Sequence, residues 1–316
     1  MAVETTTFSN NSADTWFRDI MFDCVLCPRA CHVNRLAGQT GYCGQTAELM
    51  AARASLHYWE EPCISGTSGS GTVFFSGCNL RCVFCQNHNI ALGKAGRVIA
   101  PEHLAEIFLQ LQEQEANNIN LVTPTHFLPQ IVIALEQAKQ QGLHLPIVYN
   151  TGSYESPEAL RHLEGLVDIY LPDLKYFSPE LSTAYSHAPD YFETACAAIS
   201  EMYRQVGDSV IDEDTGLMQH GMIVRHLLLP GQTKDSKKIL RYLHETYGDH
   251  IYISIMNQYT PLPQVADIEV LNRTVTPEEY DRVLRFAERI GIERGFRQEG
   301  TAASESFIPE FDERGL

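Results

Sequence analysis

The sequence has no apolar run approaching the roughly 20 residues that a membrane-spanning helix needs. Its N-terminal stretch, MAVETTTFSNNSADTWFRD, lacks both the basic part and the apolar part of a secretory signal. Repeats and low-complexity tracts are absent as well. These absences lead us to expect a cytoplasmic protein with no membrane partner, whose thiols stay reduced.

Positive charge is also scarce. Lys and Arg total 23 against 40 Asp and Glu, so the formal net charge is −17. A nucleic-acid groove needs many Lys and Arg side chains against phosphates, so we expect no nucleic-acid partner. The chain is otherwise ordinary, with 316 residues, 44% of them hydrophobic and 20% charged. This composition indicates a globular protein of one or two domains.

Cysteine is abundant and clustered. Of nine cysteines, seven lie in two groups, 24–43 and 78–85, whereas Cys63 and Cys196 stand alone and are expected to be structural. Cys78, Cys82 and Cys85 are three thiols on one tight loop, whereas a disulfide framework uses an even number of cysteines, usually in a short secreted chain. Three thiolates can hold three irons of a [4Fe–4S] cube and leave the fourth iron open for an outside ligand.

From about residue 72, short β-rich runs alternate with helical patterns. The predicted strands are Thr72–Ser76, Ile119–Thr123, Pro146–Asn150, Asp168–Leu171, Met222–Leu229 and His250–Met256. Predicted helices follow Pro101, cover 127–142, begin at Ser156 and at Thr276, and form a pair within 178–207. Continuous apolar strands that alternate with helices are typical of a parallel sheet, which carries its chemistry at the carboxyl ends of the strands.

We therefore expect an α/β fold, a partial (βα)6 TIM-like barrel with a short Cys-rich N-terminal segment. The expected divisions are an arm and metal-binding segment at 1–56, the barrel at 57–300 and a tail at 301–316. The first 20 or so residues are expected to form a flexible arm. The tail is expected to dock through Phe307, Ile308 and Phe311.

The stretch FFSGCNLRCVFCQN resembles the cysteine motif of the radical S-adenosylmethionine (SAM) superfamily. Within it, the chain is most similar to activating enzymes of glycyl radical enzymes. Among these it resembles the pyruvate formate-lyase activating enzyme-related proteins that carry an extra N-terminal motif, here CVLCPRACHVNRLAGQTGYC. The resemblance covers about residues 24 to 300.

This resemblance implies a [4Fe–4S] cluster on Cys78, Cys82 and Cys85, with SAM on its open iron. One electron, from a donor such as flavodoxin or ferredoxin, would cleave SAM to a 5′-deoxyadenosyl radical that abstracts hydrogen from a substrate. The favoured substrate is a glycine of a glycyl radical enzyme. The alternatives are modification of a small molecule or peptide and, in another class, a ferredoxin-like two-cluster electron carrier.

The resemblance also implies cofactor-binding residues at the strand ends. The segment NLVTPTHF replaces a Gly-Gly-Glu type motif, so Thr123 is a candidate there, with Thr125 or His126 as alternatives. Asn150 and Thr151 align with residues that help bind a monovalent cation. The full expected set is Phe84, Thr123, Asn150, Thr151, Asp173, Lys175, Arg225 and Asn257, with Arg225 on the cofactor carboxylate and Asn257 or Gln258 on adenine or substrate.

The first cysteine group has four thiols, Cys24, Cys27, Cys31 and Cys43. Four thiolates can close a tetrahedral zinc site or an auxiliary [4Fe–4S] cluster, and spacing does not choose between them. Reduced structural cysteines are the third alternative. A complete shell would leave no open position, so such a centre would serve structure or electron transfer. His32 is expected to be an exposed polar residue outside it.

Overall fold

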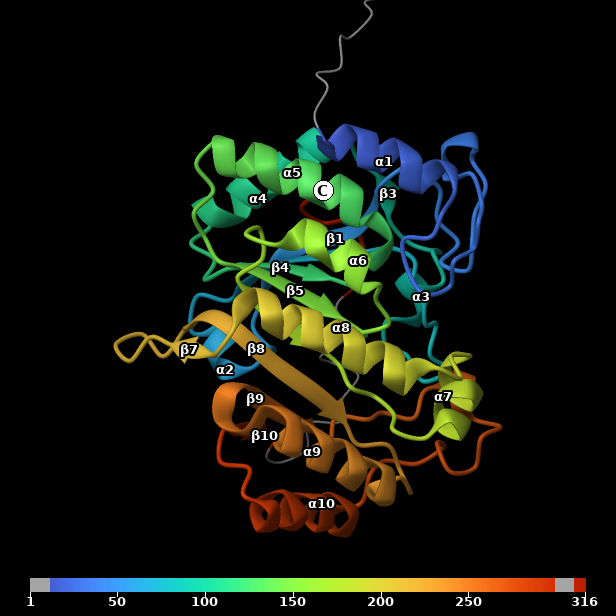
Figure 1. Ribbon diagram of the computed structural model, residues 1–316, viewed down its shortest axis with the longest axis vertical. Helices are drawn as coiled ribbons and strands as arrows, with labels where there is room; N and C mark the ends of the chain where they lie inside the picture. The colour runs from blue at the N-terminus through green and yellow to red at the C-terminus, as the bar shows by residue number, and fades with distance from the viewer. Residues whose placement is uncertain (1–11, 299–309) are drawn as a thin grey trace, which may run out of the picture.

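The computed structural model describes residues 12–298 and 310–316 (Figure 1). Its main feature is a sheet in the order β10-β9-β8-β6-β5-β4-β2-β1-β3. The neighbouring strands from β2 to β10 in this order are parallel, whereas β1 pairs antiparallel with both β2 and β3. The parallel strands are β2 (Ser70–Phe75), β4 (Ile119–Val122), β5 (Ile147–Thr151), β6 (Ile169–Pro172), β8 (Met218–Leu227), β9 (Tyr252–Met256) and β10 (Gly295–Arg297).

The expected α/β class and its parallel sheet are confirmed, and each of the six predicted strands exists. Because β10 and β3 lie at opposite ends of the strand order, the described sheet is not a closed barrel. The remaining strands are β1 (Met50–His57), β3 (Arg97–Val98) and β7 (Val210–Ile211), which pairs with β8. The predicted division at 56/57 stays a prediction, although β1 is part of the sheet.

The helices begin where the sequence provides start signals. Proline occupies the first turn of α4, α5, α6, α7 and α10, where its missing N–H costs nothing. Thr276 and Glu279 form the predicted capping box of α10. The helices are α1 (Ser12–Phe22), α2 (Pro62–Ser65), α3 (His88–Ala91), α4 (Pro101–Glu113), α5 (Leu128–Gln140), α6 (Pro157–Leu160), α7 (Pro179–Ser186), α8 (Tyr191–Val206), α9 (Thr233–Tyr247) and α10 (Pro277–Ile290).

The expectation of a flexible arm over the first 20 residues is wrong for the described part of that range. Residues 12–22 form α1, which packs against α5. Met21 is fully buried, and the Trp16 ring stacks on His162 at 3.6 Å between centroids. Apolar side chains on one face of this stretch bury themselves on the neighbouring helix, and that burial stabilises the helix.

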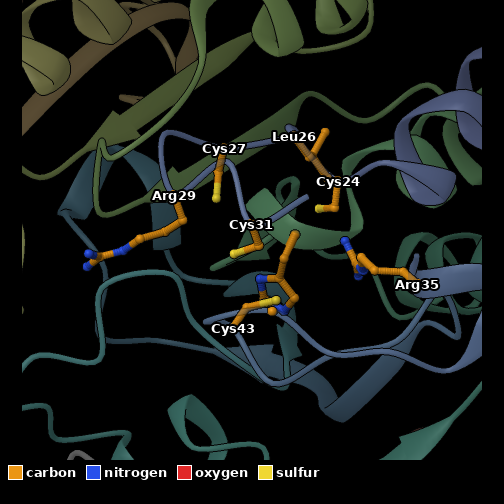
Figure 2. A pocket seen from close by; sticks show the side chains of 9 residues that line it. Cys24, Leu26, Cys27, Arg29, Cys31, Arg35 and Cys43 are labelled. Carbon is orange, nitrogen blue, oxygen red and sulfur yellow. The ribbon is translucent and has the colours of Figure 1, made fainter. Parts of the chain in front are cut away.

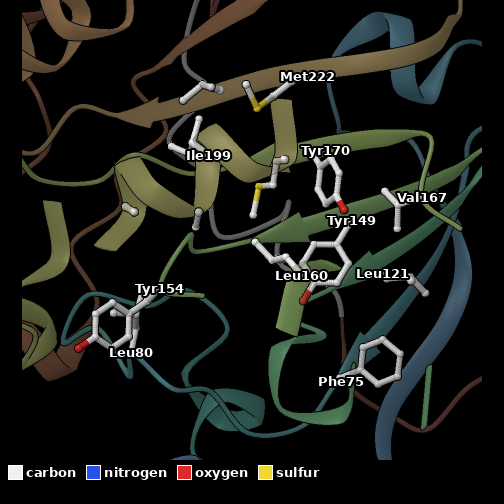
Figure 3. Packing of buried hydrophobic residues seen from close by; sticks show 14 of the residues in the cluster. Phe75, Leu80, Leu121, Tyr149, Tyr154, Leu160, Val167, Tyr170, Ile199 and Met222 are labelled. Atoms are coloured by element: carbon white, nitrogen blue, oxygen red, sulfur yellow. The ribbon is translucent and has the colours of Figure 1, made fainter. Parts of the chain in front are cut away.

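The core fills the space between the sheet and its covering helices. Tyr149 and Tyr170, from adjacent parallel strands, meet in a T-shaped contact at 5.8 Å and are fully buried (Figure 3). Leu160 of α6 and Ile199 of α8 belong to the same buried cluster (Figure 3).

Within the described residues, no helix combines the length and apolarity that crossing a bilayer requires.

The end of the chain docks on β1, as expected. Ala54 donates its N–H to the Arg314 carbonyl at 2.9 Å, and Glu313 donates to the Ala52 carbonyl at 3.1 Å. The Phe311 ring contacts Phe74 at 5.5 Å between centroids. Phe307 and Ile308, the other two expected anchors, lie outside the described residues.

Candidate active site and a second cysteine cluster

The loop that follows β2 carries Cys78, Cys82 and Cys85 to the carboxyl end of the parallel sheet. All three line a cavity of about 270 Å³. Most of the residues that the sequence assigned to cofactor binding line it too: Phe84, Thr123, Asn150, Thr151, Asp173, Lys175 and Arg225. Strands of a parallel sheet end at the same edge, and this explains why residues about 150 positions apart in the chain meet here.

Neighbouring groups orient two of the three thiols. The Ser186 hydroxyl donates to the Cys82 sulfur at 3.0 Å, and the Leu80 N–H points to the Cys78 sulfur at 3.4 Å. Phe84 is 7% exposed and meets Tyr176, Tyr185 and Tyr259 edge to face at 6.0 to 6.4 Å. This aromatic cage holds the cysteine loop against the barrel and keeps water from one side of the cavity.

A network of opposite charges forms the wall that contains Arg225. Its guanidinium donates to Asp173 at 3.0 Å, to Glu60 at 2.9 Å and to the Asn150 side-chain oxygen at 2.5 Å. Lys175 donates to the other oxygen of Asp173 at 2.6 Å. Two carboxylates and two cations thus share one buried wall, so each charge has a partner.

The ionisation of this wall follows from its pairing. Burial by itself would raise the pKa of Asp173, but Lys175 and Arg225 outweigh burial and hold that pKa below its usual value. Burial opposes the charge of Lys175, yet Asp173 raises its pKa above the ordinary range. Glu61 lies beside this wall, and burial raises the pKa of its carboxyl. Asp173 and Lys175 therefore keep their charges at neutral pH.

Of two further predicted residues, Thr123 lines the cavity and Asn257 does not. Thr123 lines the cavity with φ +56°, a left-handed conformation that is strained for a β-branched residue and typical of functional sites. Asn257 is not among the lining residues, whereas Gln258 is. The Asn257 N–H donates to the Gln298 side chain at 2.8 Å.

Several residues of the site were missed by sequence reasoning. Glu60 and Trp59 follow β1 and line the cavity, and the pair Glu60-Glu61 after an apolar strand was the available signal. The contact of Ser186 with Cys82 could not be predicted from the sequence, because the two residues are 104 positions apart. Glu155 gave no signal: it is 1% exposed and accepts hydrogen bonds from Thr125 and Thr151.

The four N-terminal cysteines line a second, much smaller cavity. Cys24, Cys27, Cys31 and Cys43 surround a space of about 10 Å³, shared with Leu26, Arg29, Arg35, Gly41 and His126 (Figure 2). Tight turns make this possible: the Ala30 N–H donates to the Cys27 carbonyl at 3.0 Å, and Ala30 and His32 have positive φ. His32 itself lies outside the cavity in an exposed pair with Asp23, as expected.

The two cysteine groups are linked by a few direct contacts. The Tyr42 hydroxyl, next to Cys43, donates to the carbonyl of Leu80, which lies between Cys78 and Cys82, at 3.4 Å. Arg29 donates to the carbonyls of Asn79, Ser186 and His187 at 2.9, 3.0 and 2.5 Å. The N-terminal loop is thus fastened to the mouth of the barrel beside the first group.

The residues around the large cavity fit a [4Fe–4S] cluster and SAM. Three thiols border one side and charged and amide groups border the other, where an amino acid head group can be bound. The volume of the large cavity, about 270 Å³, is close to the lower end of the range for small-molecule sites, roughly 300–1,000 Å³. Within the described ranges, no three His, Cys, Asp or Glu side chains are arranged to share one metal ion. A cubane cluster asks for another arrangement, because each thiolate binds a different iron.

A family model and a known protein each match more than half of this chain. Residues 72–243 match the family model described as the radical SAM superfamily. An uncharacterised protein of Methanocaldococcus jannaschii is 27% identical over 286 residues, which cover 87% of this chain and 77% of that protein.

Two solved structures are similar at low identity. One is a radical SAM methyltransferase from Sphaerobacter thermophilus, 17% identical with a TM-score of 0.47, which covers 75% of this chain and 69% of that one. The other is a domain of pyruvate-formate lyase-activating enzyme from Bacteroides vulgatus, 14% identical with a TM-score of 0.42, which covers 58% of this chain and 100% of that domain.

Proposed function

The chain belongs to the radical SAM superfamily, whose members bind a [4Fe–4S] cluster and SAM, and from that premise we propose that Cys78, Cys82 and Cys85 hold the cluster and that the adjoining cavity binds SAM. The observation that carries this proposal is that the three thiols line the same cavity as the charged groups Asp173, Lys175 and Arg225. When bound, the cluster supplies a low-potential electron, and SAM supplies the carbon-centred radical that removes hydrogen from a substrate.

The protein's own residues bind and orient. Arg225 and Lys175 offer cationic N–H groups toward the cofactor carboxylate, and Asn150 and Thr151 offer uncharged donors and acceptors at the same edge. Asp173 holds both cations in place. The Phe84 cage excludes water from the thiol side, as radical chemistry requires.

For the substrate, we propose a glycine of a protein partner, a glycyl radical enzyme. The sequence resemblance supports this choice, as does Trp59, which lines the cavity and is 64% exposed. An exposed tryptophan beside a reactive cavity is the kind of residue that contacts a protein partner. The electron comes from a one-electron donor such as flavodoxin or ferredoxin. Hydrogen abstraction from a small molecule or peptide is the rival for the same site.

Anaerobic reconstitution with iron and sulfide, followed by dithionite and SAM, tests the proposal. The wild type should form 5′-deoxyadenosine and methionine, whereas Cys78→Ala, Cys82→Ala and Cys85→Ala should form neither. Cys63→Ala is the matched control and should behave as the wild type, because Cys63 lies in a separate core cluster. Undiminished deoxyadenosine in any of the three variants would overturn the proposal.

Isotope transfer separates the substrate classes. Deuterated glycine in a candidate partner protein should place deuterium in the deoxyadenosine. Deuterium that arrives only from a labelled small molecule or short peptide would favour the rival. A reconstituted protein that binds no SAM would point instead to a two-cluster electron carrier.

A further inference from the structure

We propose that Cys24, Cys27, Cys31 and Cys43 hold a second metal centre, bound by four thiolates, and that Arg35 is the residue that matches its negative charge. The proposal goes beyond the SAM reaction and does not depend on it. It begins from position: all four thiols line one small cavity, although Cys43 is 12 residues from the nearest of the other three.

Arg35 is the first independent sign of a ligand. It is 1% exposed, and its Nε and Nη2 both donate to the Thr46 carbonyl, at 3.1 and 2.7 Å. Its Nη1 is buried without a partner. Among residues 12–298 and 310–316, none of the salt bridges includes Arg35.

A buried cation without an anion is costly, so the cavity needs negative charge. Four protonated thiols carry none and would leave Arg35 with only the Phe127 ring, 5.8 Å from its guanidinium carbon, as a cation–π partner. Four thiolates around a dipositive centre leave a net negative charge beside the guanidinium, whether the centre is zinc or a cubane cluster. The charge on Arg35 therefore favours a metal-bound state over reduced structural cysteines.

His126 and Gly41 give two further indications that the cavity of the four N-terminal thiols holds a ligand. His126 lines the same cavity and is 2% exposed. Its Nε2 lies 2.6 Å from the Ser76 carbonyl, and its Nδ1 is buried without a partner. At Gly41, a Cβ atom would lie 2.7 Å from the Cys31 sulfur, so only glycine leaves that thiol its place.

The backbone already makes the type of bond that metal-bound thiolates accept. The Tyr42 N–H, next to Gly41, points to the Cys31 sulfur at 3.3 Å. Hydrogen bonds to the sulfurs tune such centres and orient their ligands. Since four cysteines complete the shell, this centre keeps no open position for a substrate and serves structure or electron transfer.

Metal content in a chain without the first site is the decisive measurement. The Cys78→Ala/Cys82→Ala/Cys85→Ala variant is reconstituted anaerobically with iron and sulfide or with zinc, freed of unbound metal and analysed. About four irons with matching sulfide identifies a cubane cluster, in which each thiolate binds a different iron. About one zinc identifies a tetrahedral site, and it would show that the four side chains turn from their present positions to share one ion. Either result supports the centre. Further change of Cys24, Cys27, Cys31 and Cys43 to Ala should remove the metal, whereas Cys196→Ala should not.

A folded triple variant that retains neither metal would overturn the proposal, as would metal that stays after the four N-terminal cysteines are removed. If the triple variant does not fold, the iron and zinc content of the reconstituted wild type is measured instead. About eight irons, or about four irons with one zinc, supports two centres, and about four irons without zinc overturns the second. Failure of the SAM reaction leaves these metal counts unaffected, so the two proposals fail separately.

The assignment of Arg35 has its own test, a chelator challenge of the loaded protein. Arg35→Met keeps the length and loses the charge, so metal affinity should fall roughly 10- to 100-fold. Arg35→Lys should retain most of the affinity. Equal affinity in Arg35→Met and the wild type would overturn Arg35 as the charge-matching residue.

Discussion

The guanidinium of Arg225 meets three partners at once, two carboxylates and an amide oxygen, inside the cavity wall. An arginine fixed in this way offers SAM a rigid cation, because its partners hold it in one orientation. The same bonds also give Arg225 a structural role. A measurement of SAM affinity distinguishes this structural role from a role in SAM binding.

Arg225→Ala should weaken SAM binding by roughly 10- to 150-fold, the loss expected when a charge-assisted hydrogen bond of about 1.5–3 kcal/mol is removed. Arg225→Lys should recover only part, since an ammonium group cannot bind in a fork. Titration beside the iron content of each variant is the measurement. If Arg225→Ala binds SAM as tightly as the wild type and holds a full cluster, Arg225 only pairs with Glu60 and Asp173 and does not bind SAM.

Glu155 is the buried residue whose ionisation should govern the pH dependence of stability. Burial raises its pKa to about 7, against the opposing hydrogen bonds from Thr125, Thr151 and Tyr149. Its second oxygen has no partner. The folded state therefore prefers the protonated carboxyl.

A carboxyl whose pKa rises on folding favours the folded state at low pH and loses that contribution as pH rises. We expect Glu155 to contribute a loss of about 3 kcal/mol in the free energy of unfolding, spread from about pH 4.5 to 7. Glu155→Gln cannot ionise, so denaturant titrations should show a smaller loss between pH 5 and 8 in this variant than in the wild type. Equal losses would show that Glu155 does not titrate in this window.

At the scale of elements, the N-terminal cysteine loop is held to the barrel by Arg29. Besides its three carbonyl bonds, its guanidinium lies 3.9 Å from the centroid of the Tyr42 ring. It joins the loop of residues 24–43 to the cysteine loop after β2 and to the end of α7.

Arg29→Ala should loosen residues 24–43 without unfolding the sheet. Hydrogen exchange of that segment should accelerate, while exchange in β4 and β5 stays unchanged, because local opening depends on local contacts. Arg285→Ala is a matched control, since Arg285 forms an exposed pair within α10. Equal protection of the loop in both variants would contradict this role.

At the scale of the whole molecule, the end of the chain covers an edge of the sheet. Residues 313–314 bond to the backbone of β1 at 52–54, and Asp312 pairs with Arg53 at 2.9 Å. Phe311 packs on Phe74, which also lines the large cavity. An open strand edge can pair with a strand of another chain, and this cover opposes such pairing.

Deletion of residues 310–316 should therefore promote self-association, detected as a rise in mass by light scattering as protein concentration increases. Asp312→Asn is the control. It removes one exposed charge pair, worth at most about 1 kcal/mol, and keeps the main-chain cover. A truncated chain that scatters as the control does at every concentration would show that β1 needs no cover.

The sequence by itself determined the α/β class, the six central strands and the cysteine loop. These depend on local patterns: apolar runs between helix signals, and three thiols within eight residues, which any fold must leave close together. Most of the expected cavity residues followed, because parallel strands end at one edge.

Only the tertiary structure decided how distant side chains pair. Glu60 with Arg225, Ser186 with Cys82, and α1 against α5 join segments that are far apart in the chain, and their contacts depend on distances that spacing does not encode. The same holds for Gln258, which lines the cavity where Asn257 does not, because the path of the chain after β9 decides which side chain reaches it. The unpaired charge of Arg35 is visible only once the fold has buried it among four thiols, because burial, and not residue type, makes a lone cation costly.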